Sequence, residues 1–123
     1  MRAILSDGVS GIGGLTLSNV AVPAPGPGEV AVCVSAVALN FFDTLVVQGK
    51  YQHRPTPPFS PGGEIAGVVS ALGAGVTEFV VGQRVMAYVK FNGCREVSIA
   101  NASDLISIPD GVTDEVAAGL TIT

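Results

Sequence analysis

Two small polar groups stand within otherwise apolar stretches of the chain, and they are the first candidates for chemistry. One comprises Asn40, Asp43 and Thr44 in "ALNFFDTLVVQGKY", and the other is Gly62-Gly63-Glu64 in "SPGGEIAGVV". Amide and carboxylate groups can orient a ligand or stabilise developing charge, and glycines let the backbone approach it closely. Because the two groups flank a stiff loop, we expect them to form two walls of one cleft.

A structural interpretation of the same residues stays open. In that interpretation Asn40 and Asp43 cap a short turn, and Glu64 pairs with a nearby arginine or backbone amide. Sequence spacing alone does not separate it from the functional interpretation.

Several familiar site patterns are absent from the sequence. The single histidine, His53, is expected at the surface, and with Cys33 and Cys94 far apart no zinc site is predicted. The segments that begin at Gly11 and Gly73 start as G-x-G but lack the sixth glycine and the strand-to-helix context, so we interpret them as turns. No G-x-S-x-G segment indicates a serine nucleophile.

Composition limits the possible partners. The chain has 123 residues, enough for one domain, with 48% hydrophobic and 13% charged residues. A net charge of −4 and six scattered basic residues argue against a nucleic-acid surface. The short apolar run at the N-terminus is neither a signal peptide nor a membrane anchor, so we expect a cytoplasmic protein without a membrane partner.

The expected elements are mainly strands, because glycines and prolines punctuate short β-branched runs. Helix signals are confined to a short turn that ends at Gly49 and a helix start at Thr113. Residues 50–63 carry four prolines and are predicted to form a stiff, extended loop with a functional role. The predicted strands are 2–5, 15–22, 30–39, 64–72, 84–89, 94–99 and 105–108.

The chain resembles a known family over nearly all of its length. The segments "LNFFDTLVVQGKY", "PFSPGGEIAGVVSALGAGVTEFVVGQRV" and "ISIPDGVTDEVAA" follow, in order, the N-terminal part of medium-chain dehydrogenase/reductases. The branch that it resembles most is the zinc-independent, NADPH-dependent quinone oxidoreductases. The resemblance implies a GroES-like catalytic domain, which is a distorted, partly open β-barrel with one or two short helices.

In that family a Rossmann domain follows the catalytic domain, and the active site lies between the two. The sequence stops among apolar residues at "GLTIT", before any such domain. We therefore expect residues 1–123 to be a GroES-like catalytic domain, truncated before the nucleotide-binding domain, that has negligible activity alone.

The resemblance also implies catalysis without zinc. Zinc-dependent relatives carry a cysteine where this chain has Asn40 and a histidine where it has Gly63. They also insert a lobe of four cysteines after a turn that corresponds to residues 82–85, and no cysteine cluster follows that turn here. The cofactor implied is NADPH, held mainly by the absent Rossmann domain.

Site roles are carried over from the family residue by residue. Asn40 is expected beside the nicotinamide and the substrate, with its amide as the donor to the substrate oxygen, and Tyr51 on the substrate wall as a weak candidate acid. Glu64 is expected to be partly buried and to organise the site rather than donate a proton. The further cleft residues implied are Phe41, Asp43, Leu45, Gly62 and Gly63.

Two positions depart from the family pattern. Leu45 stands where many relatives have a tyrosine that contacts cofactor or substrate, which weakens the typical quinone pocket. Gln83 replaces an aspartate in a turn away from the site, where the change is expected to bear on stability only.

The implied reaction is hydride transfer from NADPH to a small-molecule quinone or activated enone. An alkenal or enoyl reductase of the same superfamily is the alternative among enzymes. A stand-alone GroES-like binding module is the alternative from another class, because one fold serves many functions. Exposed apolar residues would favour self-association, so a homo-oligomer is also expected.

Overall fold

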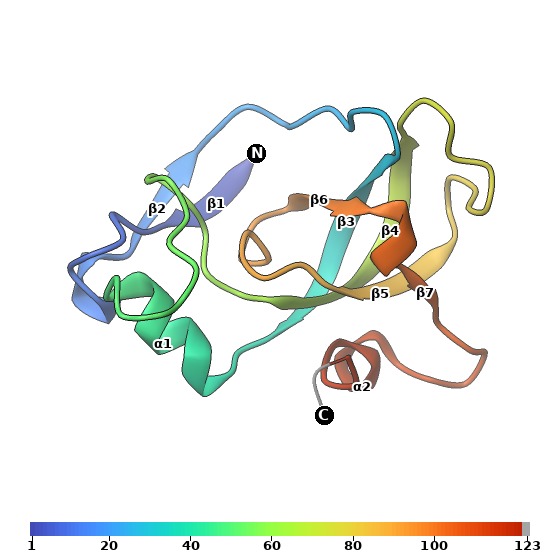
Figure 1. Ribbon diagram of the computed structural model, residues 1–123. Coiled ribbons are helices and arrows are strands. Elements are labelled where there is room, and N and C mark those ends of the chain that lie inside the picture. Colours follow the sequence, from blue (N-terminus) through green and yellow to red (C-terminus); the bar gives the residue numbers. More distant parts are fainter. Residues whose placement is uncertain (122–123) are drawn as a thin grey trace.

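The computed structural model describes residues 1–121 of the chain, and its architecture is mainly β (Figure 1). A five-stranded antiparallel sheet has the order β6-β3-β4-β5-β7, and β1 and β2 form a separate two-stranded sheet. The strands are β1 (Arg2–Leu5), β2 (Thr16–Asn19), β3 (Glu29–Ala38), β4 (Glu64–Leu72), β5 (Arg84–Tyr88), β6 (Val97–Asn101) and β7 (Ile106–Ser107). The helices are α1 (Phe41–Val47) and α2 (Asp114–Ala118), with short 3-10 turns η1 (Ile12–Gly14) and η2 (Ala102–Asp104).

The main core lies on the inner face of the large sheet. Alternate residues of β3, including Val30 and Val32, are fully buried there, as period-2 patterning predicts. The sheet coils around this core without closing, because within residues 1–121 each of β6 and β7 pairs with one neighbour only. The buried core comprises Val30, Val32, Ile65, Val69, Val85, Ala87, Ala100 and Leu105.

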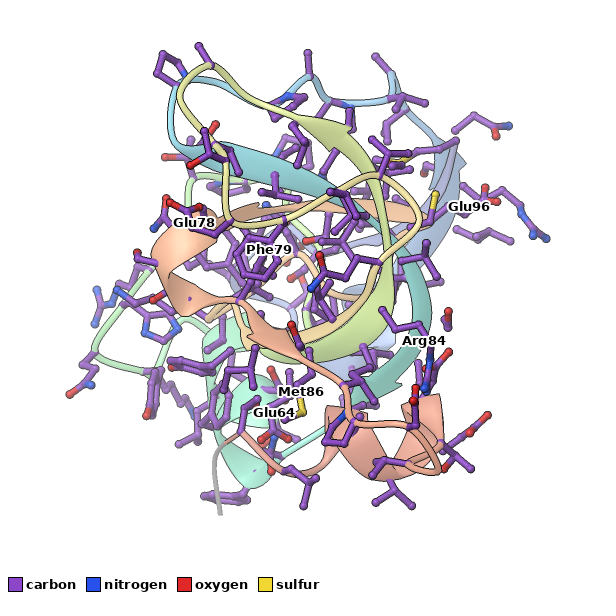
Figure 2. The ribbon with its side chains drawn as sticks, turned by 90° about the vertical axis from the view of Figure 1, so that its right-hand side faces the viewer. Glu64, Glu78, Phe79, Arg84, Met86 and Glu96 are labelled. Atoms are coloured by element: carbon purple, nitrogen blue, oxygen red, sulfur yellow. The ribbon has the colours of Figure 1, made fainter. Side chains whose placement is uncertain are left out.

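Helix α2 covers part of the outer face of the sheet. Ala117 and Ala118 pack against Ala66 of β4 in a second, smaller cluster. The Arg84 guanidinium on β5 donates to the Asp114 carboxylate at 2.7 Å and to the Val112 carbonyl at 2.6 Å. Figure 2 shows Arg84 extending toward α2 in this way. The ion pair therefore fixes α2 on the strand that carries part of the candidate site.

Helix α1 lies beside the β1–β2 hairpin (Figure 1). Val46 and Val47 on its inner side pack with Phe59 in a third buried cluster. The backbone N–H of Ser6 donates to the Phe59 carbonyl at 2.7 Å, which ties the end of the proline-containing loop to the hairpin. The loop is thus anchored at the end that leads into β4.

The predicted strands are all present, with differences at their ends. β2 is four residues long, shorter than predicted, because the hairpin pairing ends with the bonds between Val20 and Met1 at the start of the chain. β6 begins at Val97 rather than at Cys94, because the Cys94 backbone bonds to Pro61 and Ile4 instead of to a strand of the large sheet. The predicted short turn before Gly49 is a seven-residue helix, and the predicted start at Thr113 is confirmed.

Candidate functional site

The candidate site begins at the N-terminus of α1, where Asn40 occupies the capping position. Asn40 is extended, with φ −120° and ψ 167°, and its backbone N–H donates to the Asp43 carboxylate at 2.8 Å. A side chain at the third helical position that returns to the cap satisfies a donor that the helix leaves free. The structural interpretation of Asn40 and Asp43 as a cap is therefore confirmed.

Asp43 also joins the two polar groups. Its second carboxylate oxygen accepts the Gly62 backbone N–H at 3.2 Å, and the side chain is only 5% exposed. Burial raises the pKa of Asp43, and the charge of Glu64 adds to this, while the two backbone N–H groups partly oppose the rise. Asp43 thus holds the start of α1 against the glycine turn.

Glu64 is the first residue of β4 and lies beneath this junction. The Asn40 side-chain amide donates to one carboxylate oxygen at 3.2 Å, and the Thr121 hydroxyl donates to the other at 3.2 Å. The expected partial burial is wrong: the side chain is 2% exposed, because β4 is a central strand and Thr121 covers its outer face. Figure 2 shows Glu64 beside Met86, on the part of the sheet near α2.

The glycine turn needs its glycines for two separate reasons. Gly62 has φ +97°, which L side chains rarely adopt, and a Cβ there would lie 2.8 Å from Val37. A Cβ at Gly63 would lie 2.7 Å from the tip of the Phe42 ring and 3.0 Å from the Lys90 carbonyl. The Phe42 ring therefore fills the space that a side chain at position 63 would need.

A second segment of backbone locks this turn in place. The N–H groups of Val89, Asn92, Gly93 and Cys94 donate to the carbonyls of residues 60–63 at 2.6 to 2.9 Å. The Asn92 side chain also accepts the Ser60 N–H at 2.9 Å. So many bonds across two loops make the turn a rigid support for its neighbours.

An aromatic wall borders the site, made of Phe42, Tyr51 and Tyr88. The Phe42 ring centroid lies 5.6 Å from that of Tyr51 and 6.2 Å from that of Tyr88. These separations are typical of favourable aromatic pairs. Tyr51 lies in this wall, whereas the sequence reasoning missed Tyr88. The sequence carried no sufficient signal for it, because only the pairing register of β4 and β5 places Tyr88 opposite Glu64.

His53 extends the wall and is not a simple surface residue. Its ring is half-buried, 4.9 Å from Tyr51 and edge-on to it. Its Nε2 atom is buried and, among the described residues, has no hydrogen-bond partner. The expectation of a surface histidine is wrong because the loop folds back onto Phe91 and the aromatic wall.

The remaining predicted cleft residues lie outside this buried network. The Phe41 ring at the start of α1 is 78% exposed, and Leu45, one turn later, is half-buried. Both therefore present apolar surface beside Asn40. Gln83 lies in a turn away from the site, as expected. Its side chain accepts the Val80 N–H within that turn and donates to the Ser107 hydroxyl of β7.

Two cavities border parts of the site. One of about 480 Å³ runs along the open side of the sheet and is lined by Tyr88, Lys90 and Thr121 among others. Another of about 420 Å³ lies between the hairpin and α1 and is lined by Asn40, Asp43, Thr44 and mostly apolar residues. Both volumes are in the range of ligand sites.

The residues present do not fit a zinc ion of the type found in zinc-dependent relatives. Within residues 1–121 no group of three or more His, Cys, Asp or Glu side chains is placed to hold a metal. Burial raises the pKa of the Cys94 thiol to about 11, which disfavours the thiolate that metals require. The space at Gly63 is taken by Phe42.

Comparison with known proteins agrees with this fold and arrangement. The model of the Alcohol dehydrogenase GroES-like domain matches residues 26–118. The crystal structure of human synaptic vesicle membrane protein VAT-1 homolog-like protein superposes with a TM-score of 0.91 at 39% identity, covering 96% of this chain and 38% of that chain. A mycobacterial protein complexed with NADPH gives a TM-score of 0.86 at 38% identity, covering 96% of this chain and 37% of that chain. Quinone oxidoreductase-like protein 2 of Rattus norvegicus is 39% identical over 109 residues, which are 89% of this chain and 31% of that protein.

These findings define a GroES-like domain. The chain belongs to the alcohol dehydrogenase GroES-like domain family, in the quinone oxidoreductase branch of the medium-chain dehydrogenase/reductases. The predicted family and the predicted mainly β, partly open fold are thus confirmed. The chain spans about a third of the length of the relatives that it matches.

Neither helix of residues 1–121 has the length and apolar character needed to cross a bilayer. The expected cytoplasmic location and self-association stay predictions.

Proposed function

We propose that the chain is the catalytic domain of a zinc-free, NADPH-dependent oxidoreductase that transfers hydride to a quinone or an activated enone. The observation that carries the proposal is the direct contact of Asn40 with Glu64 at a side-chain-free stretch of backbone, next to an aromatic wall. A domain that served only as a scaffold would not need a buried carboxylate to orient an amide. The names of the rat relative and of the mycobacterial structure support the reaction class and the cofactor.

The chain's own residues would bind and orient the substrate carbonyl. An amide nitrogen carries two hydrogens. The Asn40 amide gives one to Glu64 and can direct the other at the substrate oxygen, where negative charge develops. Glu64 fixes which end of the amide faces the substrate, and Asp43 fixes the backbone that carries it. The proposed role of Glu64 is therefore orientation.

The surface beside Asn40 suits a planar cofactor ring. The exposed Phe41 ring and the half-buried Leu45 side chain would pack against a nicotinamide, and the chain has no phosphate-binding glycine loop of its own. When bound, a reduced nicotinamide supplies the hydride. Most of the cofactor's binding energy would come from a nucleotide-binding domain outside this chain.

The proposal is tested in the full-length protein that carries these residues. NADPH oxidation would be followed by absorbance with a panel of quinones and aliphatic enones, before and after treatment with a zinc chelator. We expect turnover that the chelator leaves unchanged. Turnover of enones alone would favour the alkenal or enoyl reductase alternative. No turnover with any acceptor, or its loss with the chelator, would contradict the proposal.

Variants then test the assigned roles. Asn40→Ala should lower kcat by roughly a hundredfold, the effect of removing one donor from a developing oxyanion. Asp110→Asn, a change at an exposed turn carboxylate, serves as the matched control and should have no effect. If Asn40→Ala retains wild-type kcat, Asn40 is not the donor.

A further inference from the structure

The aromatic wall holds a second phenol, Tyr88, that the site described so far does not use. Tyr88 is the last residue of β5 and stands directly opposite Glu64 in the antiparallel pair. Residues paired in this way have their Cβ atoms about 5 Å apart on the same face of a sheet. Glu64 in turn accepts the Asn40 amide. Asn40 and Tyr88 therefore both neighbour one buried carboxylate.

The Tyr88 hydroxyl is available to a ligand. Within residues 1–121 it forms no hydrogen bond, although the ring is half-buried and packs edge-on against Phe42. A phenol in such a position usually finds a partner for its O–H. Tyr88 also lines the cavity of about 480 Å³, together with Thr121, the other residue that bonds Glu64. The unused donor thus borders a cavity large enough for a small ring.

The Tyr88 hydroxyl carries its proton at neutral pH, as a hydrogen-bond donor must. Burial raises the pKa of Tyr88 above its ordinary value, and the charges of Tyr51 and Asp43 add to the rise. A phenol with a raised pKa keeps its proton at neutral pH and is a weak acid. It can donate a hydrogen bond without giving up the proton.

We propose that the Tyr88 hydroxyl donates a hydrogen bond to the carbonyl oxygen of a substrate that binds in the cavity of about 480 Å³. This inference rests on the proposed function and adds a residue that would bind the carbonyl oxygen of the hydride-accepting substrate. The ligand class that fits is a planar conjugated carbonyl compound, because the Tyr88 ring borders the cavity and offers aromatic surface beside its hydroxyl.

Tyr88 is better placed for this role than Tyr51. Tyr88 lies on β5, where its backbone pairs with Glu64 of β4, whereas Tyr51 lies in the proline-containing loop. A donor on a strand is held more precisely than one on a loop. The Tyr51 ring also packs against His53, so we assign Tyr51 a packing role within the aromatic wall.

The test uses duroquinone, whose four non-carbonyl ring carbons all carry methyl groups that hinder addition of the Cys33 or Cys94 thiol. Equilibrium dialysis of the full-length protein would give its Kd, and infrared difference spectroscopy would give the frequency of the bound carbonyl. Tyr88→Phe should raise Kd roughly three- to tenfold, the loss of one hydrogen bond. It should also move the carbonyl band to higher frequency.

Asp110→Asn, at an exposed turn, is the control and should leave the carbonyl band and Kd unchanged. Tyr51→Phe is measured beside it as the variant of the rival donor, with thermal melting as the check that all variants fold. A wild-type band and Kd in Tyr88→Phe would overturn the inference while the proposed function stands. A band shift in Tyr51→Phe alone would overturn it too. If the wild-type protein neither binds duroquinone nor reduces any acceptor, the proposed function itself fails.

Discussion

Replacing Asp43 by asparagine tests the junction on which the site depends. The carboxylate accepts two backbone N–H groups, from Asn40 at 2.8 Å and from Gly62 at 3.2 Å. An asparagine side chain has one oxygen and one NH₂ group, so it can accept only one of them and turns a donor toward the other. The Gly62 region is buried, so water does not replace the lost partner.

The size of the effect follows from these contacts. A hydrogen bond to a charged acceptor contributes about 1.5–3 kcal/mol, and an unpaired buried N–H costs about 1–3 kcal/mol. Removing a buried charge offsets part of this loss. We therefore expect Asp43→Asn to lower the free energy of unfolding by roughly 2 kcal/mol at neutral pH. With an m-value of about 2 kcal/mol/M, the midpoint in urea falls by about 1 M.

The loss of stability in Asp43→Asn should also change with pH in a defined direction. The pKa of Asp43 is raised in the folded state, so the stability linked to its protonation is present at low pH and is lost as the pH rises through the folded-state pKa. The Asp43→Asn variant lacks this titration. The gap in unfolding free energy between wild type and variant should therefore widen as the pH falls from 7 toward the ordinary aspartate value of 3.8.

The assay is urea unfolding followed by far-UV circular dichroism across that pH range. Asp110→Asn, at an exposed turn, is the control and should change the midpoint little. The reasoning is refuted if Asp43→Asn is no more destabilising than the control, or if the gap narrows on acidification.

Three further predictions concern the surroundings of the site. Gly63→Ala should destabilise the domain by roughly 1–3 kcal/mol, because its Cβ would lie 2.7 Å from a neighbouring aromatic ring; an unchanged urea midpoint would contradict this. Tyr51→Phe leaves Tyr88 as the only tyrosine of the chain, and its absorbance at about 295 nm should titrate above pH 10, the unperturbed tyrosine value; a midpoint at or below it would contradict the burial argument. Asp114→Asn removes the ion pair with Arg84 and should cost about 1 kcal/mol, with the loss reduced at high salt; an effect independent of salt would show that the charge is not responsible.

Much of the fold could be predicted because its signals are local. The alternation of β3, the turn glycines and the acidic start of α2 each act within a few residues, and the structure follows them. The start of β6 could not be predicted in the same way. The backbone of Cys94 bonds to Pro61 and Ile4, which lie far away in the sequence.

In the candidate site, too, some features follow from the local sequence and others depend on distant residues. The cap at Asn40 and Asp43 follows from their spacing of three residues. The full burial of Glu64 and the half-burial of His53 depend on Thr121 and Phe91, which come from distant parts of the chain. Tyr88 required the pairing register of β4 and β5, which the two predicted strands did not fix by themselves.

The contact between Phe42 and Gly63 limits which substitutions the site can accept during evolution. A histidine introduced at position 63 would meet the Phe42 ring, so that substitution alone should destabilise the domain. A smaller residue at position 42 must come first, and it removes the ring that both tyrosines pack against. A side chain at position 63 is therefore compatible with this fold only after a change at position 42.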